Sequence, residues 1–151
     1  MTQNTGQPIN DPIEGSGEEP QGLLAGVKVV DLTHYIAGPY CTKLLADFGA
    51  DVVKIERPGV GDDTRAWGPP FVEGFAAYFL AVNRGKRSLT LDLKEPRGLA
   101  ILEELIRRGD VVISNFRPDT MEKLGVGYGR CRELNPRIVY AIISGYGDTP
   151  D

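Results

Sequence analysis

The amino-acid sequence predicts an α/β fold, with a Rossmann-like and mostly parallel sheet that carries helices on both faces. Two observations support this fold class. Short, almost continuously apolar segments alternate along the chain with segments of helical periodicity, as in parallel sheets that are covered on both faces. The first strand, helix and strand fit into about 30 residues, which is the length of a βαβ unit.

The first predicted βαβ unit begins with a buried strand at residues 27–32. A helix opens at Gly38-Pro39, because a proline in the first turn of a helix loses no hydrogen bond. Gly49 is a natural stop after the last helical turn. The second strand follows at 51–56, and the crossover between the two strands should be right-handed.

A long loop and three further strands follow. The loop after Arg57 is rich in Gly and Pro and carries charged and aromatic side chains, which is typical of functional loops. The remaining predicted elements are a short helix at 76–82, a strand at 88–93, a helix from Glu95-Pro96 to Gly109, a strand at 110–114, short helices near 119–124 and 129–134, and a strand at 137–144.

Composition divides the chain into a tail and one domain, and it excludes one class of partner. Residues 1–22 hold four of the 21 acidic residues, no Lys or Arg and few apolar side chains, so we expect a disordered acidic tail. Residues 23–151 form the predicted domain, which carries 17 acidic and 17 basic side chains and is therefore neutral overall. A nucleic-acid-binding domain would show a basic excess, so we expect no nucleic-acid partner.

The cysteine and histidine content limits the compartment and the metal chemistry. Cys41 and Cys131 lie far apart without C-x-x-C spacing, which is typical of reduced thiols in a cytoplasmic protein. His34 is the only histidine, which excludes a histidine-rich metal site. No apolar run approaches the ~20 residues of a membrane-spanning helix, and the N-terminus lacks the pattern of a signal peptide. We expect a cytoplasmic protein without a metal or a membrane segment.

The turn after the first strand, residues 33–39, lacks the Gly-x-Gly-x-x-Gly fingerprint of dinucleotide-binding folds. The chain also lacks a P-loop and the Gly-x-Ser-x-Gly nucleophile elbow. The turn nevertheless leads into a helix N-terminus at the carboxyl edge of the sheet, which suits an anion. A plain capped helix is the alternative. His34 in this turn is either a general base or a structural residue that forms hydrogen bonds.

Three segments place cations next to predicted strands. Arg57 follows the second strand, residues 83–88 bring three cations to the start of the third, and residues 115–117 combine Asn, Phe and Arg after the fourth. Lys supplies a compact charge and Arg a bidentate fork for phosphate. Each segment alone could be a solvated charged turn. Together they predict a ligand with several phosphates and an aromatic ring.

The order of these motifs resembles the class III coenzyme A transferases (the CaiB/BaiF type), which include formyl-CoA transferase, carnitine CoA-transferase and the related α-methylacyl-CoA racemase. The resemblance covers residues 23–147. Residues 61–71 are most similar to dicarboxylyl-CoA transferases such as succinate–hydroxymethylglutarate CoA-transferase. The matching stretches are residues 24–33, Ala37-Gly38-Pro39, 45–58, Gly61-Asp62, Thr64-Arg65, Asn83, Lys86-Arg87-Ser88, 110–112, 115–118 and Gly145-Tyr146-Gly147.

The resemblance implies an enzyme that moves coenzyme A between an acyl-CoA, such as succinyl-CoA, and a carboxylic acid. It also implies that residues 23–151 are the CoA-binding, Rossmann-like N-terminal segment of a protein that forms homodimers at full length. The coenzyme contacts that it implies are Ala37, Arg57, Lys86 and Arg117, with Asn83, Asn115 and Phe116 lining the same groove.

Two departures from the family bear on function. Formyl-CoA transferase has Gln where this chain has Ile36, which argues against formyl-CoA as the substrate. Family members are more than twice as long, and their catalytic aspartate, a covalent nucleophile, lies beyond the position of Asp151. We therefore assign no catalytic residue and expect the chain alone to be inactive, with apolar patches left exposed. A non-catalytic CoA-binding remnant and a fragment of an α-methylacyl-CoA racemase are the alternatives.

Overall fold

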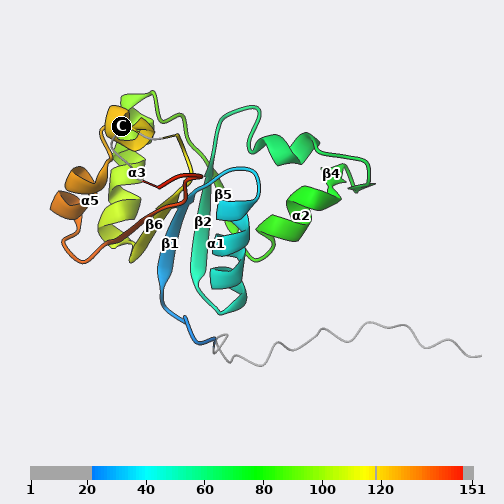
Figure 1. The fold of residues 1–151 in the computed structure, drawn as a ribbon, viewed down its shortest axis with the longest axis horizontal. Helices are drawn as coiled ribbons and strands as arrows, with labels where there is room; N and C mark the ends of the chain where they lie inside the picture. Colours follow the sequence, from blue (N-terminus) through cyan, green and yellow to red (C-terminus); the bar gives the residue numbers. More distant parts are fainter. Residues whose placement is uncertain (1–21, 118, 148–151) are drawn as a thin grey trace, which may run out of the picture.

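The computed structural model describes residues 22–117 and 119–147, so the predicted tail, apart from Gly22, and the end of the chain lie outside the described residues. Its centre is a five-stranded parallel sheet with the strand order β5-β2-β1-β6-β7 (Figure 1). The chain runs outward from β1 to β5 and then returns past β1 to β6, which confirms the Rossmann-like prediction. The strands are β1 (Lys28–Leu32), β2 (Asp51–Glu56), β5 (Arg87–Thr90), β6 (Val111–Ser114) and β7 (Val139–Ile142).

Helices cover both faces of the sheet, as predicted. α1 lies on one side with α2 packed against it, and α3 and α5 lie on the other side (Figure 1). The helices are α1 (Ala37–Asp47), α2 (Ala77–Asn83), α3 (Pro96–Arg108), α4 (Thr120–Lys123) and α5 (Tyr128–Leu134).

Each face of the sheet has its own apolar core, because the strands alternate their side chains between the two faces. Val29 and Val52 point toward α1, whereas Val30 and Val112 point toward α3. The α3 core is the larger of the two, and its Leu102 and Ile106 are fully buried. Burial of a side chain of this kind contributes about 1.5–3 kcal/mol to the free energy of unfolding.

α1 ends where the sequence predicts, for a conformational reason. Gly49 has a φ of +98°, a backbone conformation that side chains with a Cβ rarely adopt. The N–H groups of Gly49 and Ala50 donate to the carbonyl oxygens of Ala46 and Leu45, which satisfies the open end of the helix. The chain then enters β2 directly.

The long loop contains structure that the sequence did not predict. It holds a 3-10 helix η1 (Asp63–Ala66) and a small antiparallel hairpin of β3 (Phe71–Val72) and β4 (Phe75–Ala76). Asp62 caps η1, since its side chain accepts a hydrogen bond from the Thr64 N–H. The predicted strand at 88–93 is shorter in the structure, because Asp92 turns the chain by accepting from the Lys94 N–H.

Candidate functional site

The candidate site lies at the carboxyl edge of the sheet, between β1 and β6. The connection after β1 leads to α1 on one face, while the connection after β6 leads to α4 and α5 on the other. Ligands of open α/β sheets bind in the crevice at such a switch point. His34 and Asn115 follow the two strands and join them across this crevice. The His34 N–H donates to Asn115 Oδ1 at 2.8 Å, and Asn115 Nδ2 donates to the His34 carbonyl at 2.7 Å.

The His34 ring forms one wall of the crevice. It stacks on Phe116, with ring centroids 5.4 Å apart and an interplanar angle of 26°. Burial, reinforced by the positive charge of Lys54, holds the pKa of His34 below its usual value of 6.5. The imidazole is therefore neutral at pH 7, and its face and Phe116 offer an uncharged aromatic surface at the edge of the sheet.

Two cavities are lined by both rings of this aromatic pair, and a third is lined by Phe116 alone. The first, of about 270 Å³, is lined by both rings and by the charged side chains of Arg57, Asp63 and Arg117. The second, of about 400 Å³, extends over Phe116 toward β5 and has mostly apolar walls. The third, of about 420 Å³, reaches the N-terminus of α1 at Ala37. A cationic cavity next to an apolar one suits a ligand with phosphate and uncharged parts.

Arg57 is an exposed cation that a ligand can reach. Its side chain is 55% exposed, and its Nη2 lies 2.6 Å from Asp63 Oδ1. Exposed ion pairs of this kind contribute little to stability and are easily exchanged for another partner. Tyr35 lies beside this pair, and a hydrogen bond to Asp63 raises the pKa of its hydroxyl.

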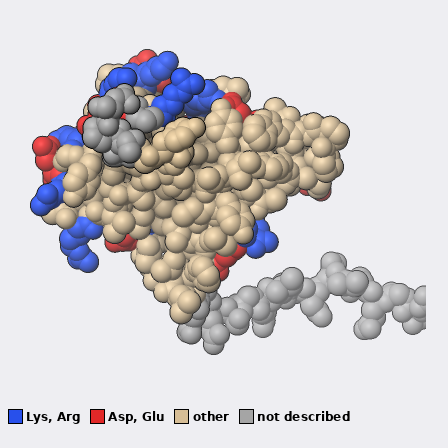
Figure 2. All heavy atoms as spheres, viewed as in Figure 1, with Lys and Arg blue, Asp and Glu red and all other residues tan. Residues whose placement is uncertain are grey.

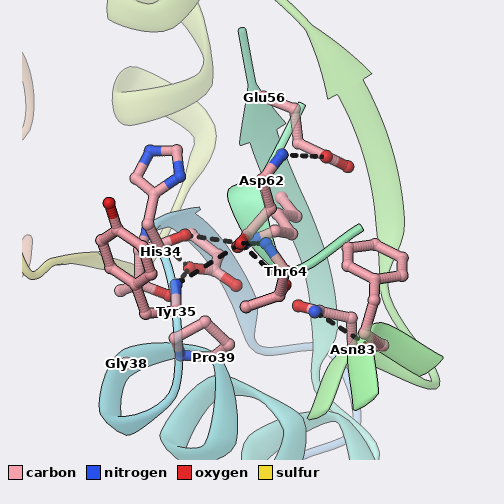
Figure 3. A network of polar contacts seen from close by, with 12 residues as sticks. His34, Tyr35, Gly38, Pro39, Glu56, Asp62, Thr64 and Asn83 are labelled. Atoms are coloured by element: carbon pink, nitrogen blue, oxygen red, sulfur yellow. Dashed lines mark hydrogen bonds and ion pairs between the residues drawn. The ribbon is translucent and has the colours of Figure 1, made fainter. Parts of the chain in front are cut away.

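A buried ion pair supports the turn at residues 33–39 from below. Lys54 Nζ lies 2.9 Å from Asp62 Oδ2 and donates to the Thr33 carbonyl at 2.6 Å, and the side chains of both charged residues are at most 1% exposed. Asp62 Oδ1 accepts from the Thr64 N–H and hydroxyl. Burial alone would raise the pKa of Asp62, but the hydrogen bonds from Lys54 and Thr64 hold it below its usual value. Figure 3 shows Asp62 between Glu56 and the segment that carries His34 and Tyr35.

A second buried lysine lies under the start of α1. Lys86 Nζ donates to Asp31 Oδ2 at 3.0 Å, to the Pro39 carbonyl at 2.9 Å and to Asn83 Oδ1 at 2.8 Å. Its side chain is 2% exposed. Burial lowers the pKa of Lys86 to about 8, although the negative charge of Asp31 opposes this shift. Asp31 also accepts from the hydroxyl of Thr42 on α1.

The structure brings five of the seven residues implied by the resemblance to the cavities of the carboxyl edge. These are Ala37, Arg57, Asn115, Phe116 and Arg117. Asn83 and Lys86 instead belong to the buried network under α1, with the Asn83 amide also bonded to the Phe79 carbonyl. The other two cations of segment 83–88 lie away from this edge, because Arg84 pairs with Asp47 and Arg87 with Asp51 at the amino end of β2.

Sequence reasoning missed two residues of the site. Tyr35 lines the first cavity, and Lys54 supports the turn. A signal for Lys54 existed, because a lysine inside an otherwise apolar strand needs a buried partner. Tyr35 gave no signal, since its place depends on the path of the turn. Asp63, which lines the same cavity, lies in the charged loop that the sequence indicates as functional.

Residues 22–117 and 119–147 contain neither a candidate metal site nor a candidate membrane span. No group of three or more His, Cys, Asp or Glu residues there could hold a metal ion. No helix in the same part of the chain is sufficiently long and apolar to span a bilayer.

Comparison with known proteins shows the family to which the chain belongs. The sequence profile described as CoA-transferase family III matches residues 24–151. The chain belongs to CoA-transferase family III. It is 51% identical over 132 residues to succinate–glutarate CoA-transferase of Agrobacterium fabrum, a match that covers 83% of this chain and 33% of the relative. It is 52% identical over 132 residues to succinyl-CoA:mesaconate CoA-transferase of Haloarcula hispanica, covering 84% and 33%.

A solved structure shows the same fold. A CaiB/BaiF family protein from Brucella suis superimposes with a TM-score of 0.82 at 46% identity, covering 86% of this chain and 35% of that one. The chain thus spans about one third of the length of the family III relatives that it matches. The family membership confirms the predicted resemblance and the α/β fold.

Proposed function

We propose that this chain is the coenzyme A-binding N-terminal part of an enzyme that transfers CoA between an acyl-CoA and a carboxylic acid. The observation that carries the proposal is the junction of a cationic and an apolar cavity at the β1–β6 switch point, in a chain of CoA-transferase family III. CoA combines phosphates, which suit Arg57 and Arg117, with uncharged parts that suit the apolar cavity over Phe116. The CoA-binding residues in this proposal are Ala37, Arg57, Asn115, Phe116 and Arg117, whereas contacts of Asn83 and Lys86 with the coenzyme are implied by the family resemblance alone.

The names of two relatives support a proposal for the substrate class. Two similar proteins carry names with succinate or succinyl-CoA and a second dicarboxylate, glutarate or mesaconate. We propose succinyl-CoA as the acyl donor and a dicarboxylic acid as the acceptor. In this proposal the nucleophile lies downstream, in the two thirds of the relatives that this chain does not span. The two free thiols fit a cytoplasmic protein.

Calorimetry with CoA tests the binding proposal on the 151-residue chain. Arg57→Ala and Arg117→Ala should each weaken CoA binding about tenfold, because each removes a cation from the first cavity. Arg87→Ala is the matched control, since Arg87 is also an exposed arginine in an ion pair, on Asp51, but lies at the amino end of its strand. An unchanged affinity in both cavity variants would refute the proposed site.

Isotope exchange tests the catalytic part. The 151-residue chain should not exchange label between succinyl-CoA and glutarate, whereas the same chain extended by a family III C-terminal part should do so. Exchange by the chain alone would show that its nucleophile lies within these residues. CoA binding without exchange by the extended protein would favour a non-catalytic remnant.

We also propose that the extended protein is a homodimer. The exposed side of α1 supports an interface of this kind, because Ile36, Tyr40, Leu44 and Phe48 recur at a spacing of four residues and are 36–51% exposed. Figure 2 shows that the surface over α1 and α2 is largely uncharged, while Lys and Arg gather along the upper margin of the view. Sedimentation of the extended protein would measure its oligomeric state, and a monomer at micromolar concentration would contradict the proposal.

A further inference from the structure

The turn at residues 33–39 is held by side chains from other parts of the fold. At its start, the Thr33 carbonyl accepts from Lys54 Nζ. At the next residue, both backbone groups of His34 bond to Asn115. At the end of the segment, in the first turn of α1, the Pro39 carbonyl accepts from Lys86 Nζ. In a surface connection between a strand and a helix, the backbone N–H and C=O groups normally form hydrogen bonds with water. Hydrogen bonds from three side chains to the backbone of one such connection are therefore unusual.

The backbone conformation of the turn explains why it must be held. Tyr35 has a φ of +66°, which is uncommon for a residue with a side chain. Gly38 packs so closely on Thr33 that a Cβ there would lie 2.3 Å from the Thr33 Cβ. A turn in this conformation persists only when its surroundings determine it. The two buried lysines are the charged donors at its two ends.

Neither ammonium group is accessible to a ligand in this structure. The Lys54 and Lys86 side chains are 1% and 2% exposed. Each pairs with a carboxylate that is itself fully buried, Asp62 for Lys54 and Asp31 for Lys86. Ion pairs in such surroundings are costly to desolvate and are weak evidence for a contribution to stability alone. Their shared feature is the backbone carbonyl that each one binds in the turn.

We propose that Lys54 and Lys86 are positioning residues, which hold the turn at residues 33–39 so that His34 and Ala37 face the ligand, and which do not touch the ligand themselves. The proposal rests on the proposed CoA site, and it gives Lys86 a different role from the direct coenzyme contact implied by the family resemblance. Both ammonium groups act through the turn, one from β2 and one from the segment before β5.

The first test measures the conformation of the turn by NMR in the absence of a ligand. His34 is the only histidine, so its ring protons give resolved NMR signals. The Lys86 ammonium group bonds to the Pro39 carbonyl and not to His34, so a change of these signals in Lys86→Met reports on the turn. We expect the nuclear Overhauser effect between the His34 and Phe116 rings to weaken at least twofold in Lys86→Met. Lys43→Met is the matched control, because Lys43 is also a largely buried lysine in an ion pair, but its ammonium group bonds to the Asp47 carboxylate instead of a carbonyl of the turn.

His34 signals in Lys86→Met that superimpose on those of the unchanged protein would overturn the proposal. If Lys86→Met does not fold, the double variant Lys54→Met/Asp62→Asn tests the other end of the turn, since it removes both charges of a buried pair together. The same weakening of the His34–Phe116 effect is expected there, and its absence would likewise overturn the proposal.

The second test separates positioning from direct contact. CoA affinity is measured by calorimetry between 20 mM and 500 mM NaCl, over which salt screens exposed charges. Lys86→Met should weaken CoA binding about tenfold and keep the salt dependence of the unchanged protein, whereas Arg57→Ala should reduce that dependence. A reduced salt dependence in Lys86→Met would show a direct phosphate contact and overturn the proposal. If the unchanged chain binds no CoA, the proposed function fails, while the NMR comparison still decides the role of the lysines.

Discussion

Replacing Glu56 with Gln should remove a large and strongly pH-dependent part of the stability of this domain. Glu56 ends β2, and its carboxylate accepts four hydrogen bonds. Arg65 donates two, from Nε at 2.7 Å and Nη2 at 2.6 Å, Ser88 donates one at 2.7 Å, and the Asp62 N–H donates one at 3.0 Å. The Glu56 side chain is only 2% exposed, and the Arg65 guanidinium lies 3.9 Å from the centre of the Phe79 ring. The carboxylate therefore joins the long loop to β5.

The pKa of Glu56 gives the size of its contribution to the free energy of unfolding. Burial alone would raise it, but the bonds from Arg65, Ser88 and Asp62 lower it from 4.5 to about 2. At about 1.4 kcal/mol per pKa unit, the ionised carboxylate adds about 3 kcal/mol to the free energy of unfolding at pH 7. Because the pKa in the folded state lies below that in the unfolded state, this contribution is complete above about pH 5 and is lost as the pH falls toward 2.

Urea unfolding of both proteins at several pH values measures this contribution. Glu56→Gln should be about 2–3 kcal/mol less stable than the unchanged protein at pH 7, since Gln keeps part of the hydrogen bonding, and the difference should shrink steadily between pH 5 and pH 2. Glu104→Gln is the control, because Glu104 also pairs with arginines but is exposed, so its replacement should change stability little. A difference for Glu56→Gln that stays the same from pH 7 to pH 3 would refute the reasoning.

Three further predictions concern packing and thiol chemistry. Gly38→Ala should lower the free energy of unfolding by about 1–3 kcal/mol, because the added Cβ would overlap Thr33. Gly129→Ala in α5 should raise it by up to about 1 kcal/mol, because a Cβ there meets nothing within 4 Å. Thermal unfolding measures both changes, and equal shifts would contradict the geometry. Leu102→Ala should cost about 2–5 kcal/mol in urea unfolding, because Leu102 is fully buried in the α3 core, and a loss below 1 kcal/mol would contradict that burial. Burial, together with nearby carboxylates, raises the pKa of Cys131 to about 11. At pH 8 a thiol reagent should therefore modify Cys41 alone in the folded chain and both cysteines in urea. Rapid modification of both cysteines without urea would contradict this prediction.

The elements that local sequence determines were predicted well. The second strand matches β2 over the whole of residues 51–56, and the long helix begins at Pro96 and stops before Gly109, as its proline and glycine indicated. The almost continuously apolar strands also indicated a parallel sheet that helices cover on both faces, as the structure shows. These features depend on residues that are close along the chain, so one sequence is sufficient to predict them.

The candidate site was predicted only in part, because its geometry depends on contacts between distant residues. Arg57 and Asn115 lie where the ends of their strands place them, and that follows from the strand order. The surroundings of Lys86 do not follow from the strand order, because its three hydrogen-bond partners come from β1, α1 and α2. A basic segment at residues 83–88 therefore looked like one cationic surface, whereas the structure directs its three cations to three different carboxylates.

The apolar stripe on the exposed side of α1 also has a consequence for synthesis on the ribosome. The chain matches about one third of the length of its relatives, and we propose above that it is the N-terminal part of a longer enzyme. Domains fold from the N-terminus as the chain emerges. At roughly 5–20 residues per second, the remaining two thirds take on the order of 15–50 s to appear. In a full-length protein built on this N-terminal part, Tyr40, Leu44 and Phe48 would face solvent for that time. The same three side chains would then be the point at which a nascent chain needs a chaperone.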